Sequence, residues 1–376
     1  MGLFATNRQA IKQPQFSQIT LPPVLKASLP TITLLLFLAT ASSIAVGQPH
    51  RRPLPKMPPT EPMVHDPVVA QAPDGTYYML STGRGLQVAT STDLQEWQVS
   101  REPFISHIPS WTHDSVPNFR DHIWAPDIIH YNGRWWIAYS CSTFGVNTSA
   151  IGLLSSPELS TATQWTDEGP LICSREGRDP FNAIDPAFIT DGDNTPWMVF
   201  GSFWDGIQLV RLNPATMHVD PTIPITTIAR RYPNPTGEEK AEAKPADARY
   251  ADKENPIEAP FIYYHDGYYY LFVSWDYCCR QEQSTYKVAV GRSTSVSGPY
   301  LDKDGNDMAH GGGTLLLEGD KTHYYAAGHC SAYHFASADH FFCHGYNASY
   351  DGISTLIHLL LQWQDGWPSL EQYPPL

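Results

Sequence analysis

The fold is decided by the stretch PIEAPFIYY at residues 256–264, in which one carboxylate stands between two prolines in an otherwise apolar run. Proline cannot donate a hydrogen bond to a β-ladder, so it occurs at strand starts, at sheet edges and in bulges. We therefore expect a strand that begins, or lies exposed at an edge, beside Glu258. A carboxyl group desolvated in that position would have a raised pKa, as a general acid requires.

The same pattern occurs five times along the chain. Each copy has an apolar strand with one polar residue, a turn rich in Asp, Asn and Gly, and then a cluster of aromatic residues. The copies start at Asp66, Asp127, Asp185, Glu258 and His329. Each copy is long enough for four short antiparallel strands. The repeat predicts an all-β protein whose five sheets pack radially as a five-bladed β-propeller, with a long β-sandwich as the alternative.

The first strand of a propeller blade usually lines the central channel, so the five polar residues are expected to converge at one mouth. Asp66, Asp185 and Glu258 together could perform glycosidic chemistry. One would activate water, a second would protonate the leaving oxygen, and a third would keep the donor protonated. A lone Asp-Pro is more simply a turn or capping residue, but three such carboxylates favour catalysis. Asp127 is expected to support the site rather than to react.

Composition narrows the class of protein. The 33 Pro and 26 Gly among 376 residues leave little room for long helices. The net charge of −14 argues against nucleic acid or anionic lipid as a partner and suits an uncharged or cationic ligand.

The first 47 residues have the pattern of a secretory signal with a long leading region. Basic residues precede an apolar run at 32–46 that is short for a membrane span and ends in small residues. We expect a secreted, extracellular protein with a Pro-rich linker at 48–62 and one catalytic domain at 63–376. An uncleaved signal anchor is the alternative. The charged stretch 214–255 is expected to hold an outer strand and a solvated loop, with a lid as the alternative.

Two sequons and six cysteines agree with secretion. The sequons are at Asn147 and Asn347. The adjacent Cys278 and Cys279 lie closer than the usual span of a disulfide, which favours two unpaired thiols. Cys330 with Cys343, and Cys141 with Cys173, are possible pairings that the sequence leaves open.

Five ordered motifs in this chain resemble those of glycoside hydrolase family 43, in particular its endo-1,5-α-L-arabinanases. They are His65-Asp66-Pro67, WAPDI at 124–128, NAIDP at 182–186, IEAPFI at 257–262 and Gly328-His329. The resemblance covers residues 63–368 and implies an inverting hydrolase. Asp66 would be the general base, Glu258 the general acid, and Asp185 the residue that tunes the acid. Inversion needs space for a water molecule, so base and acid should lie about 6.5–9.5 Å apart.

The resemblance also implies a set of ligands. The substrate would be arabinan or arabino-oligosaccharides, bound by a monomer that needs no organic cofactor. The implied sugar contacts are Asp66, Gly145, Asn182, Ala183, Ile184, Asp185, Ser202, Phe203 and Trp204, although Trp204 could instead pack between blades. The resemblance further implies a disulfide between Cys278 and Cys279.

His329 matches a histidine that reaches calcium or a similar cation in the channel, with water completing the shell. Calcium prefers oxygen ligands, so a hydrogen-bonded channel histidine is the alternative. The segment Ala327-Gly328-His329-Cys330 departs from the usual family pattern.

Three rival interpretations remain. Arg178-Asp179-Pro180 imitates a motif of fructan-cleaving propellers, but those enzymes have Glu-Cys where this chain has Glu258-Ala259, so Asp179 is expected to be structural. An exo-acting arabinofuranosidase or β-xylosidase of the same family is disfavoured by the few residues after Pro368. A non-catalytic, sugar-binding propeller is the rival from another class of protein.

Overall fold

The computed structural model describes residues 55–160, 164–232 and 255–373. The expected signal segment and most of the charged stretch between residues 214 and 255 lie outside these ranges. Within them, no helix is long and apolar enough to cross a membrane. The described residues all belong to one compact unit.

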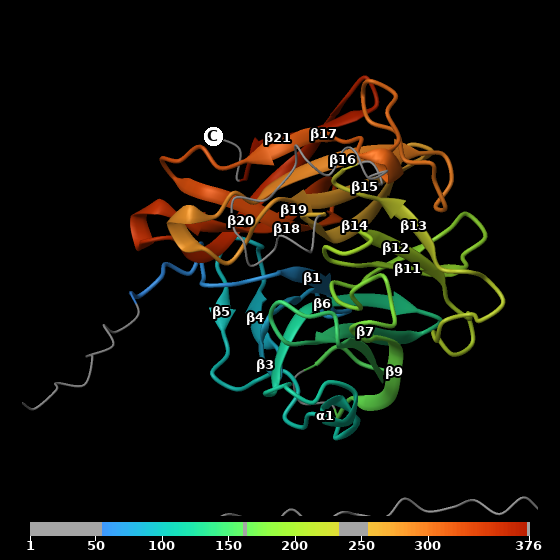
Figure 1. Ribbon diagram of the computed structural model, residues 1–376. Helices are drawn as coiled ribbons and strands as arrows, with labels where there is room; N and C mark the ends of the chain where they lie inside the picture. Colours follow the sequence, from blue (N-terminus) through green and yellow to red (C-terminus); the bar gives the residue numbers. More distant parts are fainter. Residues whose placement is uncertain (1–54, 161–163, 233–254, 374–376) are drawn as a thin grey trace, which may run out of the picture. The chain divides into compact units, whose positions relative to one another are not determined.

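The fold is the expected five-bladed β-propeller, in which neighbouring strands of a blade are antiparallel (Figure 1). Blade 1 contains β1 (Val68–Gln71), β2 (Tyr77–Ser81), β4 (Gln87–Ser91) and β5 (Gln98–Val99). Blade 2 contains β6 (His122–Tyr131), β7 (Arg134–Cys141), β8 (Ser149–Ser156) and β9 (Thr166–Ser174), with the short β3 (Gly83–Arg84) paired to β6. Blade 3 contains β10 (Ala187–Thr190), β11 (Pro196–Phe200), β12 (Ile207–Arg211) and β13 (Thr226–Ala229).

The last two blades are built in the same way. Blade 4 contains β14 (Ile257–His265), β15 (Tyr268–Trp275), β16 (Lys287–Ser293) and β17 (Thr314–Glu318). Blade 5 contains β18 (Tyr324–Phe335), β19 (Ala338–Asn347), β20 (Ile353–Gln364) and β21 (Trp367–Gln372). The described part of the chain also has one short helix, α1 (Trp111–Ser115), and short 3₁₀ turns that include η3 (Gln281–Gln283), η4 (Met308–His310) and η5 (Ala348–Tyr350).

Local sequence explains the hairpins, and packing explains the radial order. Asn132-Gly133 and Asp266-Gly267 join the first two strands of blades 2 and 4, and all four residues have positive φ, as tight hairpin turns require. The second strands carry the aromatic residues that fill the space between blades. Phe272 of β15, for example, meets Phe341 of β19 edge to face at 5.9 Å.

The segment before Asp66 closes the ring by pairing with blade 5. Met63 forms a bridge with Thr355, the amide of Val64 donates to the carbonyl of Ser354 at 3.3 Å, and the amide of Leu356 donates to Pro62 at 3.0 Å. Blade 5 is therefore held from both ends of the described chain.

The structure decides the cysteine pairings and shows how far the two sequons are buried. Cys278 and Cys279 form a disulfide, whereas Cys141, Cys173, Cys330 and Cys343 are free. Asn147 and Asn347 are 1% and 5% exposed. Their side-chain amides donate to groups inside the fold, so neither offers a glycan a route to solvent.

Candidate active site

A cavity of about 640 Å³ lies at the mouth of the channel, and residues from all five blades or their loops line it. Ten of the expected site residues are among its walls: Asp66, Gly145, Asn182, Ile184, Asp185, Ser202, Phe203, Trp204, Glu258 and His329. Ala183 is the exception. It is fully buried and its amide donates to the Ser174 hydroxyl, so its contact with substrate stays a prediction.

Asp66 is held by donors on both carboxylate oxygens. Thr82 donates to Oδ2 at 2.5 Å, and Nδ1 of His65 and Nδ1 of His329 lie 2.8 and 2.9 Å from Oδ1. Burial alone would raise the pKa of Asp66, but the neighbouring His329 and His65 lower it well below its usual range. Asp66 is therefore an ionised carboxylate that can accept a proton from water.

Glu258 and Asp185 form the second carboxylate group. Burial raises the pKa of both side chains, and the charge of Glu258 raises that of Asp185 further. Ser202 donates to Oε2 of Glu258 at 2.7 Å, while the amide of Ala259 donates to Oδ2 of Asp185 at 3.1 Å. Two ionised carboxylates that are buried close together repel one another, so the pair tends to keep one proton. The pair can therefore supply a proton while Asp66 accepts one.

A left-handed residue positions the innermost segment of every blade. The positive-φ residues are Asp66, Ala125, Asp185, Ala259 and His329, with φ of 58°, 39°, 57°, 52° and 52°. All but His329 are followed by proline. Asp66, Asp185 and His329 are at the positions that the sequence repeat predicted. The alignment of Asp127 and Glu258 with them is wrong, because Ala125 and Ala259 occupy the equivalent positions.

The amide of each left-handed residue is bound by the preceding blade. Thr82, directly after β2, is the acceptor for Ala125. The acceptors on other second strands are Ser140 for Asp185, Ser274 for His329, and His344 for Asp66. In blade 3 the acceptor position is Gly201, whose φ of 128° and close contact with Gly206 exclude a side chain. The carboxylate of Asp185 takes this role and binds the amide of Ala259. Asp185 is thereby fixed beside Glu258.

The sequence did not identify these acceptors. Ser and Thr near the ends of second strands were the available signal, but an isolated hydroxyl residue is common in any sheet. His344 gave no such signal, because its partner Asp66 is almost the whole domain away in sequence.

Asp127 and Asp179 lie outside the cavity wall. Asp127 is 2% exposed, and its Oδ2 accepts the amide of Phe188 at 2.6 Å while Oδ1 has no hydrogen-bond partner. It therefore ties blade 2 to blade 3, in agreement with its expected supporting role. Asp179 accepts the amide of Arg175 and pairs with Arg178 at 2.6 Å, as expected for a structural carboxylate.

His329 concentrates positive charge between the carboxylates. Burial would lower its pKa, but attraction to Asp66, and also to Asp185 and Glu258, raises it to about 9. For a cation, His329 would offer Nε2 only after that nitrogen has lost its proton, because Nδ1 faces Asp66. Calcium would need water for most of its shell. The residues thus fit a cation bound through His329 and water, and they do not form an all-protein calcium cage.

A second grouping, His65 with Asp66 and His344, is close enough in space to hold a metal ion. The Nδ1 lone pair of His344, however, already accepts the amide of Asp66 at 3.1 Å. Within the described part of the chain, Nδ1 of His344 therefore serves as a hydrogen-bond acceptor and not as a metal ligand.

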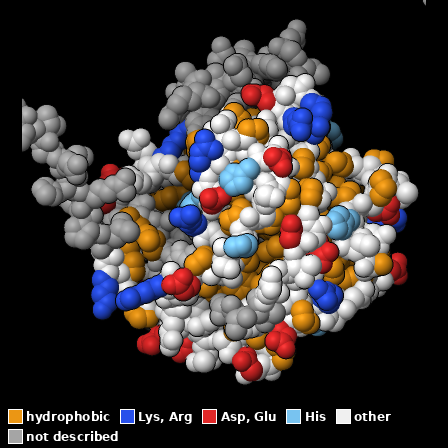
Figure 2. Space-filling view, turned by 90° about the horizontal axis from the view of Figure 1, so that it is seen from below, with side chains coloured by type: hydrophobic (Ala, Val, Ile, Leu, Met, Phe, Trp, Pro, Cys, Tyr) orange, Lys and Arg blue, Asp and Glu red, His pale blue; other side chains and the backbone are white. Residues whose placement is uncertain are grey.

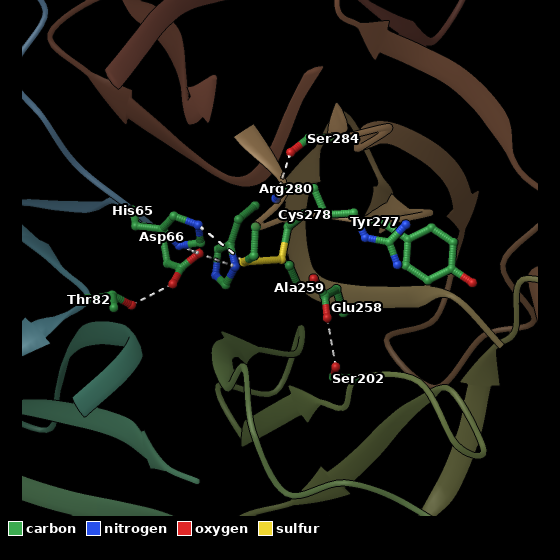
Figure 3. The surroundings of a disulfide bond; sticks show 12 residues. His65, Asp66, Thr82, Ser202, Glu258, Ala259, Tyr277, Cys278, Arg280 and Ser284 are labelled. Atoms are coloured by element: carbon green, nitrogen blue, oxygen red, sulfur yellow. Dashed lines mark hydrogen bonds and ion pairs between the residues drawn. A yellow bond between two sulfur atoms is a disulfide. The ribbon is translucent and has the colours of Figure 1, made fainter. Parts of the chain in front are cut away.

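Apolar groups cover much of the remaining wall. Trp204 faces the cavity and not only a neighbouring blade, and Phe203 packs against Tyr277 at a ring separation of 5.8 Å. Phe144 and the disulfide of Cys278 and Cys279 also line the cavity. In the view of Figure 3, the disulfide lies between Asp66 and Glu258. Flat apolar groups beside hydrogen-bonding ones suit a sugar ring.

The face of the molecule that Figure 2 shows carries both signs of charge. In the face shown in Figure 2, hydrophobic side chains gather toward the middle, with acidic, basic and histidine side chains interspersed around them. This face thus presents no extended patch of a single sign, as suits an uncharged ligand.

Comparisons with known proteins agree with this geometry. The family profile described as Glycosyl hydrolases family 43 matches residues 56–368. The extracellular endo-α-(1→5)-L-arabinanase 1 of Bacillus subtilis (strain 168) is 42% identical over 311 residues, which cover 82% of this chain and 87% of the relative. The crystal structure of an exo-1,5-α-L-arabinanase from a bovine ruminal metagenomic library is similar with a TM-score of 0.75 and 44% identity, covering 84% of this chain and 98% of that one. An α-L-arabinanase of Cellvibrio cellulosa, solved with arabinohexaose, has a TM-score of 0.74 and 38% identity, with coverages of 83% and 96%.

Proposed function

The chain belongs to glycosyl hydrolase family 43, and on that premise we propose that it cleaves internal α-1,5-L-arabinofuranosyl linkages of arabinan. The observation that carries the proposal is the convergence of Asp66, Asp185 and Glu258 on one cavity. A sugar-binding protein without activity has no need for one ionised carboxylate opposite a pair that retains a proton.

The reaction proceeds with inversion. Asp66, ionised and oriented by its donors, removes a proton from a water molecule as that water attacks the anomeric carbon. Glu258 donates its proton to the leaving glycosidic oxygen, and Asp185 beside it disfavours early loss of that proton. At the end of the step Asp66 carries the proton and Glu258 is ionised, so solvent exchange restores the starting state.

Substrate binding uses the polar and apolar walls of the same cavity. Trp204 and Phe203 provide faces for furanose rings, and Gly145 leaves the loop beside them without a side chain. Asn182 and Ile184 flank Asp185 on the same wall. The arabinohexaose bound to the Cellvibrio cellulosa relative supports a chain of several arabinose units as the ligand.

A calcium ion or similar cation held by His329 and water is part of the proposal. Bound there, it would supply positive charge to the three carboxylates, which already attract a proton to His329. Calcium binding would be measured by calorimetry on protein stripped with a chelator. An unchanged thermal unfolding midpoint with and without calcium would argue against a resident ion.

The protein is proposed to be secreted and to act as a monomer outside the cell. The name of the Bacillus subtilis relative, which is extracellular, supports the location. The basic and apolar pattern of residues 1–47 supports the same conclusion.

The proposal is tested by product analysis on linear arabinan. A ladder of arabino-oligosaccharides shows internal cleavage, and proton NMR of the first products shows inversion at the anomeric carbon. Asp66→Asn and Glu258→Gln should each reduce kcat by about 10²- to 10⁴-fold, as expected for loss of a general base or acid. A fully active Glu258→Gln variant, or retained anomeric configuration, would refute the mechanism.

Exo cleavage is the second candidate, because the ruminal relative is named an exo-enzyme at 44% identity. Release of short products of one size from the start of the reaction, without longer intermediates, would favour it over internal cleavage. Binding of arabinan without any product would favour the non-catalytic alternative.

A further inference from the structure

Beside Asp66 lies a hydrogen-bonded group, buried in part, whose central tyrosine has no role in the reaction scheme above. It consists of Tyr346 and His344 of blade 5, His65 beside Asp66, and the backbone of Cys279 in the loop after blade 4. Tyr346 is 3% exposed and lies at the centre of the group. The protons of this group can be placed one by one.

The tautomer of His344 follows from its contact with Asp66. The amide of Asp66 donates to Nδ1 of His344 at 3.1 Å, so that nitrogen carries no proton. His344 is fully buried, and burial lowers its pKa well below the usual value, which leaves the ring neutral. The single ring proton therefore lies on Nε2, which is 3.3 Å from the hydroxyl of Tyr346. His344 donates to that hydroxyl.

The hydroxyl of Tyr346 receives a second proton from the backbone. The amide of Cys279 donates to it at 2.7 Å. With both acceptor positions of the oxygen filled, its own proton must point to another acceptor. The closer one is Nε2 of His65 at 3.1 Å, whereas the sulfur of Cys279, a weak acceptor, lies at 3.9 Å.

A proton donated to Nε2 of His65 places the ring proton of His65 on Nδ1. That nitrogen lies 2.8 Å from Oδ1 of Asp66, where a donor is required because an ionised carboxylate only accepts. The rings of His65 and His344 also stack, with centroids 3.8 Å apart, so a change in one affects the other.

We propose that Tyr346 is a positioning residue for Asp66, because its hydroxyl accepts from His344 and donates to His65 and so fixes both imidazoles in the tautomers that hold Asp66. The disulfide loop takes part through the amide of Cys279, which sets the direction of the Tyr346 hydroxyl. The inference rests on the proposed function only where it treats Asp66 as the general base.

The tautomers can be read directly in the unmodified protein. Nitrogen-15 NMR of the imidazoles, assigned with His65→Gln and His344→Gln variants, should show His65 protonated on Nδ1 and His344 protonated on Nε2 at pH 7. A His65 protonated on Nε2, or a His344 protonated on Nδ1, would overturn the assignment. This outcome is independent of whether the protein cleaves arabinan.

The variant Tyr346→Phe tests the consequence for the reaction. It should shift the nitrogen signals of His65 and lower kcat about tenfold with KM within twofold, because the base is misoriented while the sugar contacts remain. The matched control is Tyr131→Phe, which removes a tyrosine hydroxyl of blade 2 that donates to the carbonyl of Asn194 and does not line the cavity, so the His65 signals should stay in place. Wild-type kcat in Tyr346→Phe would overturn the proposal, and absence of arabinan cleavage by the wild type would instead refute the function.

Discussion

At the scale of single residues, Ser202 sets the pH range in which Glu258 can act as an acid. Its hydroxyl donates to Oε2 of Glu258 and so favours the ionised form, against a burial effect that raises the pKa. In Ser202→Ala the pKa of Glu258 should therefore rise further, and the high-pH limb of kcat/KM against pH should move to higher pH. A pH–rate profile measures the shift.

The matched control is Ser142→Ala. Ser142 also lines the cavity, but its hydroxyl bonds to Ser149 and to none of the three carboxylates. The high-pH limb of kcat/KM for Ser142→Ala should stay where it is in the wild type. A limb that moves to lower pH in Ser202→Ala would contradict the assignment of Glu258 as the acid.

From the buried Asp127 we predict that the stability of the protein depends on pH. Burial raises its pKa to about 7, above the value of about 3.9 for an unfolded chain. The stability it contributes is therefore complete below about pH 4 and is lost as pH rises toward 7. Urea unfolding of Asp127→Asn should show a flatter dependence across that window, by about 1.4 kcal/mol per pH unit.

The control for Asp127→Asn is Asp114→Asn, the same replacement at an exposed position, measured over the same pH range. If Asp127→Asn and the wild type had parallel curves between pH 4 and 7, the buried carboxyl group would already be ionised in the folded protein at acidic pH.

At the scale of elements, each innermost segment depends on the second strand of the blade before it. Ser140 of β7 accepts the amide of Asp185 at 3.0 Å, and both residues are buried. Ser140→Ala leaves this amide without an acceptor, so the free energy of unfolding should fall by about 1–3 kcal/mol. Denaturant unfolding measures the loss, and arabinan cleavage should also slow because Asp185 loses its anchor.

Ser369→Ala is a suitable comparison, since the Ser369 hydroxyl lies on an exposed outer strand and makes one long hydrogen bond. Equal stability of Ser140→Ala and Ser369→Ala would show that the bond between blades contributes nothing.

The same elements show what could be predicted from the sequence. The five blades and the residues Asp66, Asp185, Glu258 and His329 were predictable, because Asp-Pro, Glu-x-Pro and Asn-Gly patterns are local. The position of Glu258 one residue before the left-handed Ala259, and of Asp127 two residues after Ala125, was not. Backbone conformation at an Ala-Pro pair leaves no distinctive trace in composition. The pairing of Asp66 with His344 depends on ring closure, which no local pattern encodes.

At the scale of the whole molecule, the closing segment joins stability to the site. Val64 donates its amide to Ser354 of blade 5 and lies two residues before Asp66. Val64→Pro removes this hydrogen bond and should lower both the unfolding midpoint and kcat, because proline cannot donate. Thermal unfolding and arabinan cleavage are the measurements.

Val64→Ala is the control for Val64→Pro, since it keeps the amide and loses only buried side-chain volume. It should cost stability while retaining most of kcat at low temperature. A Val64→Pro variant with the kcat of the control would show that closure of the ring does not position Asp66.

Ring closure also has a consequence for the order of events during synthesis. Met63 is made early and Thr355 late, so the bridge between them must wait until blade 5 has been made. Contacts so distant in sequence form slowly, and incomplete chains expose unpaired strands. Asp66 needs His344 from that last blade to be seated. The protein therefore cannot seat Asp66, its proposed general base, on a partly made chain, and we expect activity only after the final blade has docked.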